Sequence, residues 1–158
     1  MTEQVRIWAG LTGFMSAAAL VALVLFFALA RPWSDVQPGW FWLGPVNDWL
    51  SVLGAGPWIV ATVLLAVHAR LGGAWWVLTG VVAAGIAALA VVTLLMLAGR
   101  TDLSVQTVTA VPVTVLAFVW TAVATSAAVR QAVLPGWVAG VAIALVVALV
   151  VGAVVVGV

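Results

Sequence analysis

The chain has 158 residues, of which 67% are apolar and 6% charged, and its net charge is +1. This charge excludes a basic nucleic-acid-binding surface, and a mean hydropathy of +1.37 excludes an ordinary soluble domain. Apolar stretches of about 20 residues can cross a ~30 Å hydrocarbon core as helices. The sequence therefore predicts one all-α transmembrane domain over residues 1–158, a helical bundle with five spans.

The first predicted span covers residues 7–30 and ends at Arg31-Pro32, because proline disfavours helix at the residue before it. Ala28-Leu29-Ala30 fits the cleavage pattern of a secretory signal. The apolar run is much longer than the ~7–15 residues of a signal h-region, which favours an uncleaved span. Residues 31–46 contain three prolines and two glycines and form a predicted Trp/Pro-rich outer loop.

The second predicted span covers about residues 48–69, because Asn47 and Asp48 are good N-cap residues. Pro57 lies inside this span, and a helix that started there would have only ~13 residues, too few to cross. We therefore expect one helix that is kinked near Pro57, with a short interfacial turn at residues 47–55 as the alternative.

Three further spans are predicted at about residues 74–98, 104–129 and 136–158. Arg gathers on the cytoplasmic side of membrane proteins, and alternation of the five spans puts three Arg on one side and two on the other. The N-terminus is therefore expected inside and the C-terminus outside. The first side carries Arg6, Arg70, Arg130 and His68, and the second carries Arg31 and Arg100.

Eight of the ten Trp residues fall near predicted span ends, where Trp prefers the boundary between lipid and water. Trp58 and Trp120 lie deeper, and we expect them to face other helices with their N–H groups bonded to a carbonyl or a Thr. The predicted interfacial belt consists of Trp8, Trp75, Trp76 and Trp137 on the inner side and Trp33, Trp40, Trp42 and Trp49 on the outer side.

The last predicted span carries a small residue at every fourth position. Such a ridge lets helix backbones approach closely, and close packing associates helices in lipid. Two interpretations stay open, namely packing within the chain and contact with a second copy or another membrane protein. The predicted helix-packing ridge consists of Gly136, Gly140, Ala144, Ala148 and Gly152.

The fourth predicted span carries Thr and Ala alternating at spacings of three and four, which places them on one face. This face is either a packing seam, whose hydroxyls bond the carbonyl one turn back, or a polar face that lines a narrow pathway. Its residues are Thr107, Ala110, Thr114, Ala117, Thr121 and Ala124. In the pathway interpretation, Gln106, Thr109 and Thr125 join them.

Six polar residues could gather at the outer surface. Capping and turn-flanking roles are the simplest account of them. The alternative is a shallow outer pocket for a small ligand or a lipid headgroup, formed by the loop at residues 31–49 and the polar face of the fourth span. This candidate outer polar cluster consists of Arg31, Asn47, Asp48, Ser51, Arg100 and Asp102.

The ionisable residues give no catalytic constellation. Every charge falls at a predicted span end, which argues against a proton relay or an ion-coupled carrier with a buried carboxylate. His68 is expected about a bilayer thickness from Asp48 and Asp102, too far for a Ser-His-Asp arrangement. There is no Cys, no metal-ligand spacing and no phosphate-binding loop, so we predict no catalytic residue, metal site or cofactor.

The segment from Asn47-Asp48 to Ala66-Val67-His68-Ala69-Arg70-Leu71 resembles a pattern in uncharacterised small multi-pass membrane proteins of actinobacteria. The resemblance covers one helix of five and implies a bacterial plasma-membrane protein without known activity. The use of Arg throughout in place of Lys also suggests a bacterial genome rich in GC. The leading prediction is a non-enzymatic membrane protein with a structural, accessory or complex-subunit role. Its expected partners are the lipid bilayer and, through the last span, a second copy or another membrane protein.

Overall fold

The computed structural model describes residues 3–30 and 39–156, with side chains up to Ala148, and every regular element in this part of the chain is a helix. This confirms the predicted all-α class. In chain order the elements are α1 (Glu3–Leu25), which continues into the short π-helix η1 (Phe26–Ala30), then α2 (Leu43–His68), α3 (Gly73–Leu97), α4 (Leu103–Arg130) and α5 (Gly136–Val156).

Four helical stretches within the described residues are long and apolar enough to cross a membrane. The shortest of them has 25 residues, which at 1.5 Å per residue extends about 37 Å and exceeds the ~30 Å hydrocarbon core. Their length and composition indicate a membrane-embedded helical bundle. The four stretches are Glu3–Ala30, Leu43–His68, Gly73–Leu97 and Leu103–Arg130.

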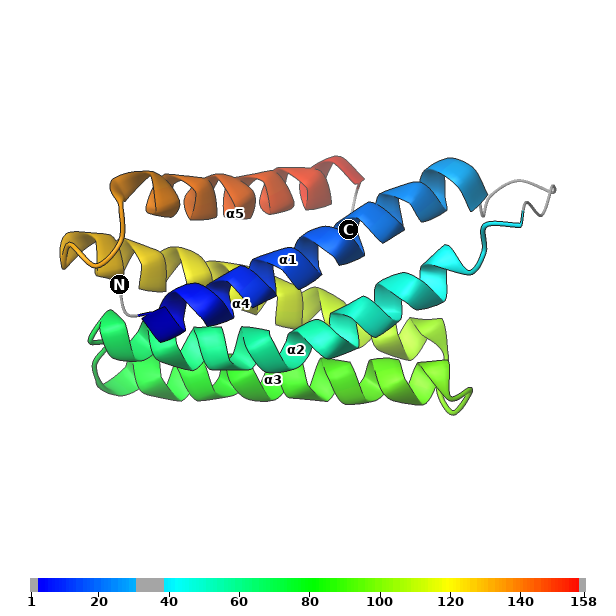
Figure 1. Ribbon diagram of the computed structural model, residues 1–158, viewed down its shortest axis with the longest axis horizontal. Helices are drawn as coiled ribbons and strands as arrows, with labels where there is room; N and C mark the ends of the chain where they lie inside the picture. Colours follow the sequence, from blue (N-terminus) through cyan, green and yellow to red (C-terminus); the bar gives the residue numbers. More distant parts are fainter. Residues whose placement is uncertain (1–2, 31–38, 157–158) are drawn as a thin grey trace.

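The helices run up and down, and each packs against the helix that precedes it in the chain (Figure 1). α2 also contacts α4, so α2, α3 and α4 form the centre of the bundle. Among the described helices, α1 contacts only α2 and its own continuation η1, and α5 contacts only α4. Both terminal helices therefore lie at the edges and leave much of their surface uncovered.

Alternating helix directions place the turns at two opposite ends of the bundle (Figure 1). We name them the Arg70 end, with the start of α1 and the turns at residues 69–72 and 131–135, and the Arg100 end, with residues 39–42 and the turn at residues 98–102. Arg6, Arg70 and Arg130 share the Arg70 end with His68, as the predicted alternation requires.

The second helix begins about one turn earlier than predicted. α2 starts at Leu43 instead of near residue 48, so Asn47 and Asp48 lie inside it and their predicted N-cap role is wrong. Pro45 is compatible with this start, because the first amide groups of a helix have no intrahelical acceptor and proline has no N–H to leave unpaired. Leu43 is buried and anchors the first turn.

An aromatic contact also holds the start of α2. The Phe26 ring of η1 lies edge-on to the Phe41 ring, with 6.0 Å between the ring centroids and 82° between the planes. A Cβ placed on Gly44 would lie 3.5 Å from the same Phe26 ring. The end of the first helical stretch therefore packs directly on the chain that leads into α2, which the hydropathy pattern does not reveal.

Pro57 lies inside a continuous α2, as one of the two alternatives predicted. Figure 1 shows α2 as one ribbon that changes direction near its middle. Proline lacks the amide N–H for the helical bond and its ring crowds the preceding turn, so it bends a helix that it does not end. The interfacial turn at residues 47–55 does not form.

The core of the bundle is built mainly from small side chains. Ala66, Ala117, Ala124 and Ala128 are completely buried and lie with Trp120 in one cluster that α2, α3 and α4 share. Small residues let helices approach closely. In lipid the hydrophobic effect does not hold helices together, so they associate through such close van der Waals packing.

Two glycines lie at the closest helix contacts. A Cβ on Gly54 of α2 would lie 3.2 Å from Cβ of Met15 on α1, and a Cβ on Gly85 of α3 would lie 3.3 Å from a methyl group of Val113 on α4. Real Cβ contacts are seldom this short. These glycines therefore set the separation of α1 from α2 and of α3 from α4.

Candidate functional site

A polar network joins three helices towards the Arg100 end. The Gln106 side-chain amide on α4 donates to the carboxylate of Asp48 on α2 at 3.2 Å and to Oγ1 of Thr93 on α3 at 3.1 Å. Thr93 is buried and Asp48 half-buried. An amide NH₂ has two donor hydrogens, so Gln106 serves both partners at once. This network pins the ends of α2, α3 and α4 to one another.

The network uses only part of the predicted outer polar cluster. Asp48 meets Gln106, whereas Ser51 donates back to the carbonyl of Asn47 at 2.9 Å. Arg100 and Asp102 are exposed in the turn between α3 and α4, where the Asp102 carbonyl accepts the first amide bonds of α4. Arg31 lies outside the described residues. Among the described members, Asp48 joins α2 to α4 through Gln106, and Ser51 bonds its own helix.

Thr and Ser hydroxyls on α4 bond their own helix. Thr107, Thr109, Thr121 and Ser126 each donate to the carbonyl four residues earlier, at 2.7–2.9 Å. Thr125 does the same with Thr121 at 2.7 Å. Between the Thr positions, Ala117 and Ala124 are completely buried. This is the pattern of a packing seam, in which each hydroxyl bonds its own helix and needs no partner on another helix.

The Trp residues separate into two groups. Trp120 is 2% exposed, and its indole N–H donates to Oγ1 of Thr79 on α3 at 3.0 Å. Trp58 is partly buried against the same core. Both placements are those predicted for the two deep Trp residues, and the bond to Thr79 confirms the expected partner of Trp120.

The other described Trp residues lie near helix ends and are exposed or half-buried. Trp49 lies on α2, and Trp33 falls outside the described residues. The members of the predicted belt near the Arg70 end are Trp8, Trp75, Trp76 and Trp137, and those near the Arg100 end are Trp40, Trp42 and Trp49.

The small residues of α5 face away from the bundle. Gly136, Gly140, Ala144 and Ala148 are all exposed, and a Cβ on either glycine would meet nothing within 4 Å. Ala142, on the opposite face of the helix, is buried. The environment of Gly152 lies outside the described side chains. The described part of the ridge therefore does not contribute to packing within the chain.

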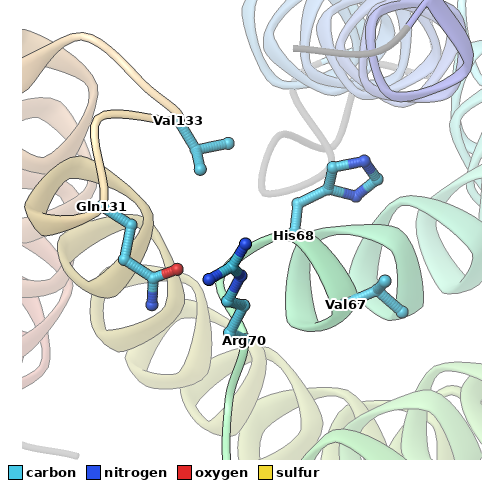
Figure 2. Close-up of a pocket in the computed structure, with 5 residues that line it drawn as sticks. All are labelled: Val67, His68, Arg70, Gln131 and Val133. Atoms are coloured by element: carbon cyan, nitrogen blue, oxygen red, sulfur yellow. The ribbon is translucent and has the colours of Figure 1, made fainter.

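A pocket lies at the Arg70 end, opposite to the end where the sequence suggested one. It has a volume of about 710 Å³ and is open on one side, and its lining residues are Val67, His68, Arg70, Gln131 and Val133 (Figure 2). The lining comes from the end of α2, the turn after it, and the turn between α4 and α5. We refer to it as the Arg70 pocket.

The two turns that line the Arg70 pocket are joined directly. The side-chain amide of Gln131 donates to the backbone carbonyl of Ala69. His68 is oriented by a 2.7 Å bond from its Nδ1 to the carbonyl of Leu64. The sequence had placed His68 and Arg70 on one side of the membrane. It gave no sign of Gln131, because a lone Gln in a turn has no distinguishing pattern.

The described part of the chain holds no group of three His, Cys, Asp or Glu residues that could bind a metal ion. Asp48 and His68 lie 20 positions apart on the single helix α2, which corresponds to about 30 Å. A Ser-His-Asp constellation between these residues is therefore excluded, as predicted. No protein-family model, curated protein or solved structure matches the chain.

Proposed function

We propose that this is a small bacterial plasma-membrane protein with a structural or accessory role, which assembles in the bilayer through α5. The observation that carries the proposal is the exposed ridge of small residues on a helix that, within the described residues, contacts only α4. Small side chains facing lipid add nothing to packing within the chain. They do allow another helix to approach closely, and this approach drives association in lipid.

The proposed topology has five spans, with the N-terminus in the cytoplasm and the C-terminus outside. α5 has 21 residues, which at 1.5 Å per residue extends about 31 Å and matches the hydrocarbon core. The Arg70 end carries three Arg residues, Arg6, Arg70 and Arg130, and the rule that Arg gathers on the cytoplasmic side makes this end the inner one.

The occupant of the α5 ridge is a second copy of the chain. Two copies inserted in the same orientation can pair their α5 helices in parallel about a twofold axis, so that each ridge packs on the same ridge of its partner. Gly136, Gly140, Ala144 and Ala148 lie one turn apart along the helix. Small residues at this spacing are typical of closely packed parallel pairs of membrane helices.

The absence of native cysteine allows a direct test by disulfide trapping in native membranes. We expect Ala144→Cys to form a disulfide-linked dimer. A disulfide needs Cα atoms within about 7 Å of each other, and close packing of the two ridges would bring the paired positions 144 that near. Leu145→Cys is the matched control, since Leu145 is also exposed and lies at almost the same depth but about 100° around the helix. It is expected to remain monomeric.

A second variant separates specific pairing from random collision. Adding Gly140→Leu to Ala144→Cys should abolish the disulfide, because a large side chain would hold the helices apart. Gly13→Leu, which fills an equally open glycine on α1, should leave the disulfide intact. Equal trapping at positions 144 and 145 would show that there is no defined interface. If a different membrane protein co-purifies and shields the cysteine of Ala144→Cys from disulfide formation, that protein, and not a second copy, occupies the ridge.

A further inference from the structure

The Arg70 pocket has the features of a site for an anionic group. Its volume of about 710 Å³ lies in the range of small-molecule pockets. In Figure 2 the guanidinium of Arg70 lies between the side chains of Gln131 and His68, with Val133 and Val67 further along the lining. A guanidinium offers paired N–H donors that match two oxygens of a phosphate group.

Arg70 lies in the left-handed turn that ends α2. Arg70 has a φ of +46° and directly follows the C-cap of α2, with its N–H bonded to the carbonyl of Val67 and the N–H of Leu71 bonded to that of Ala66. This turn favours glycine, because a Cβ is disfavoured in the left-handed region. The corresponding position after α3 is Gly99, at φ +67°, and the one after α4 is Ala132, at φ +56°, so this turn also accepts a residue with a Cβ. At Arg70 the chain carries a long cationic side chain in place of the favoured residue.

Charge around the pocket is strongly one-sided. Arg6, Arg70 and Arg130 share this end of the bundle, and among the described residues Glu3 is its one carboxylate. The pocket also presents two valine side chains, which an inorganic anion would not use. Trp75 and Trp76 are exposed at the start of α3, at the same end, where Trp residues lie at the depth of lipid headgroups.

We propose that the Arg70 pocket binds the phosphate group of an anionic phospholipid. Arg70 pairs with the phosphate oxygens, and Val67 and Val133 contact the apolar part of the lipid next to the headgroup. Basic pockets between membrane helices hold anionic headgroups in this manner. The site lies at the opposite end from the candidate outer polar cluster and does not depend on pairing through α5.

Native mass spectrometry of the full chain, purified in detergent with equal amounts of phosphatidylglycerol and phosphatidylcholine, tests the proposal. We expect the protein to retain phosphatidylglycerol preferentially. Arg70→Gly should lower the retained phosphatidylglycerol about tenfold, because it removes charge-assisted hydrogen bonds to the phosphate. Glycine suits the left-handed backbone at this position, so the variant keeps the fold, which circular dichroism and thermal unfolding verify.

Arg100→Gly is the matched control, since Arg100 is an exposed Arg in the equivalent turn at the other end. It should leave lipid retention unchanged. Equal retention of phosphatidylglycerol by the original protein and Arg70→Gly would overturn the proposal. Displacement of the lipid by millimolar inorganic phosphate would also overturn it, because the pocket would then be a site for a free anion. Disulfide trapping at position 144 in the Arg70→Gly background reports on pairing through α5 independently.

Discussion

At the scale of single residues, the bond from Trp120 to Thr79 shows how a polar group is accommodated in the core. The Trp120 N–H donates to Oγ1 of Thr79, and the Thr79 hydroxyl donates to the carbonyl of Trp75 at 2.7 Å. Each donor therefore has an acceptor, which matters because an unpaired N–H costs more where no water is available. These two hydrogen bonds tie α4 to α3 beside the buried cluster.

A double-mutant cycle with Trp120→Phe and Thr79→Val measures this bond. We expect a coupling free energy of about 1 kcal/mol, since hydrogen bonds between membrane helices contribute about that much. The measurement is reversible unfolding in mixed micelles. Trp137→Phe, at a Trp that is 71% exposed, should leave the stability unchanged. Additive effects of the two core substitutions would mean that the bond contributes nothing to stability.

At the scale of helices, two glycines that lie close together in sequence differ in what they contact. Gly54 and Gly56 lie two residues apart on α2. A Cβ on Gly54 would meet Met15 of α1 at 3.2 Å, whereas a Cβ on Gly56 would meet nothing within 4 Å. Gly54 therefore permits the close approach of α1, and Gly56 faces away from it. In the described structure α1 touches no helix other than α2, apart from its own continuation η1. The placement of α1 therefore depends on Gly54.

Replacing each of these glycines with leucine tests this difference. Gly54→Leu should destabilise the protein by about 1–3 kcal/mol, because an overfilled contact forces the helices apart. Gly56→Leu should cost less, because its side chain faces no other helix and is strained only against the ring of Pro57, the next residue. Thermal unfolding in detergent gives both values. A similar loss in the two variants would show that α1 does not rest on Gly54.

At the scale of the whole molecule, the two ends of the helical bundle carry different polar groups. The Arg100 end holds the network of Gln106 with Asp48 and Thr93, and the Arg70 end holds the cationic pocket. The centre between them is closed by alanines and by the buried Trp120. This division is consistent with the proposed pairing through α5 and the proposed lipid site at the Arg70 end.

Reporter fusions after Val158 test the five-span topology. Alkaline phosphatase, which is active only outside the cytoplasm, should be active there, and a fluorescent protein that folds only in the cytoplasm should be dark. A fusion after Arg70 should give the reverse result, because this turn is proposed to be cytoplasmic. A fluorescent C-terminal fusion would mean that α5 does not cross or that the orientation is inverted.

The sequence alone determined the helical class, the bounds of α3 and α4 and the start of α5 to within about two residues, and the partner type of Trp120. These follow from local properties: long apolar runs, turns marked by Gly and Pro, and an indole N–H that must find an acceptor.

The tertiary structure decided which small residues pack. It placed Gly54 and Gly85 at helix contacts and left Gly136 and Gly140 exposed, since the direction of a face depends on neighbours that a local pattern does not specify. For the same reason only the fold could join the turns at Ala69 and Gln131 into the Arg70 pocket: they lie 62 positions apart, and their approach depends on how α2 and α4 pack.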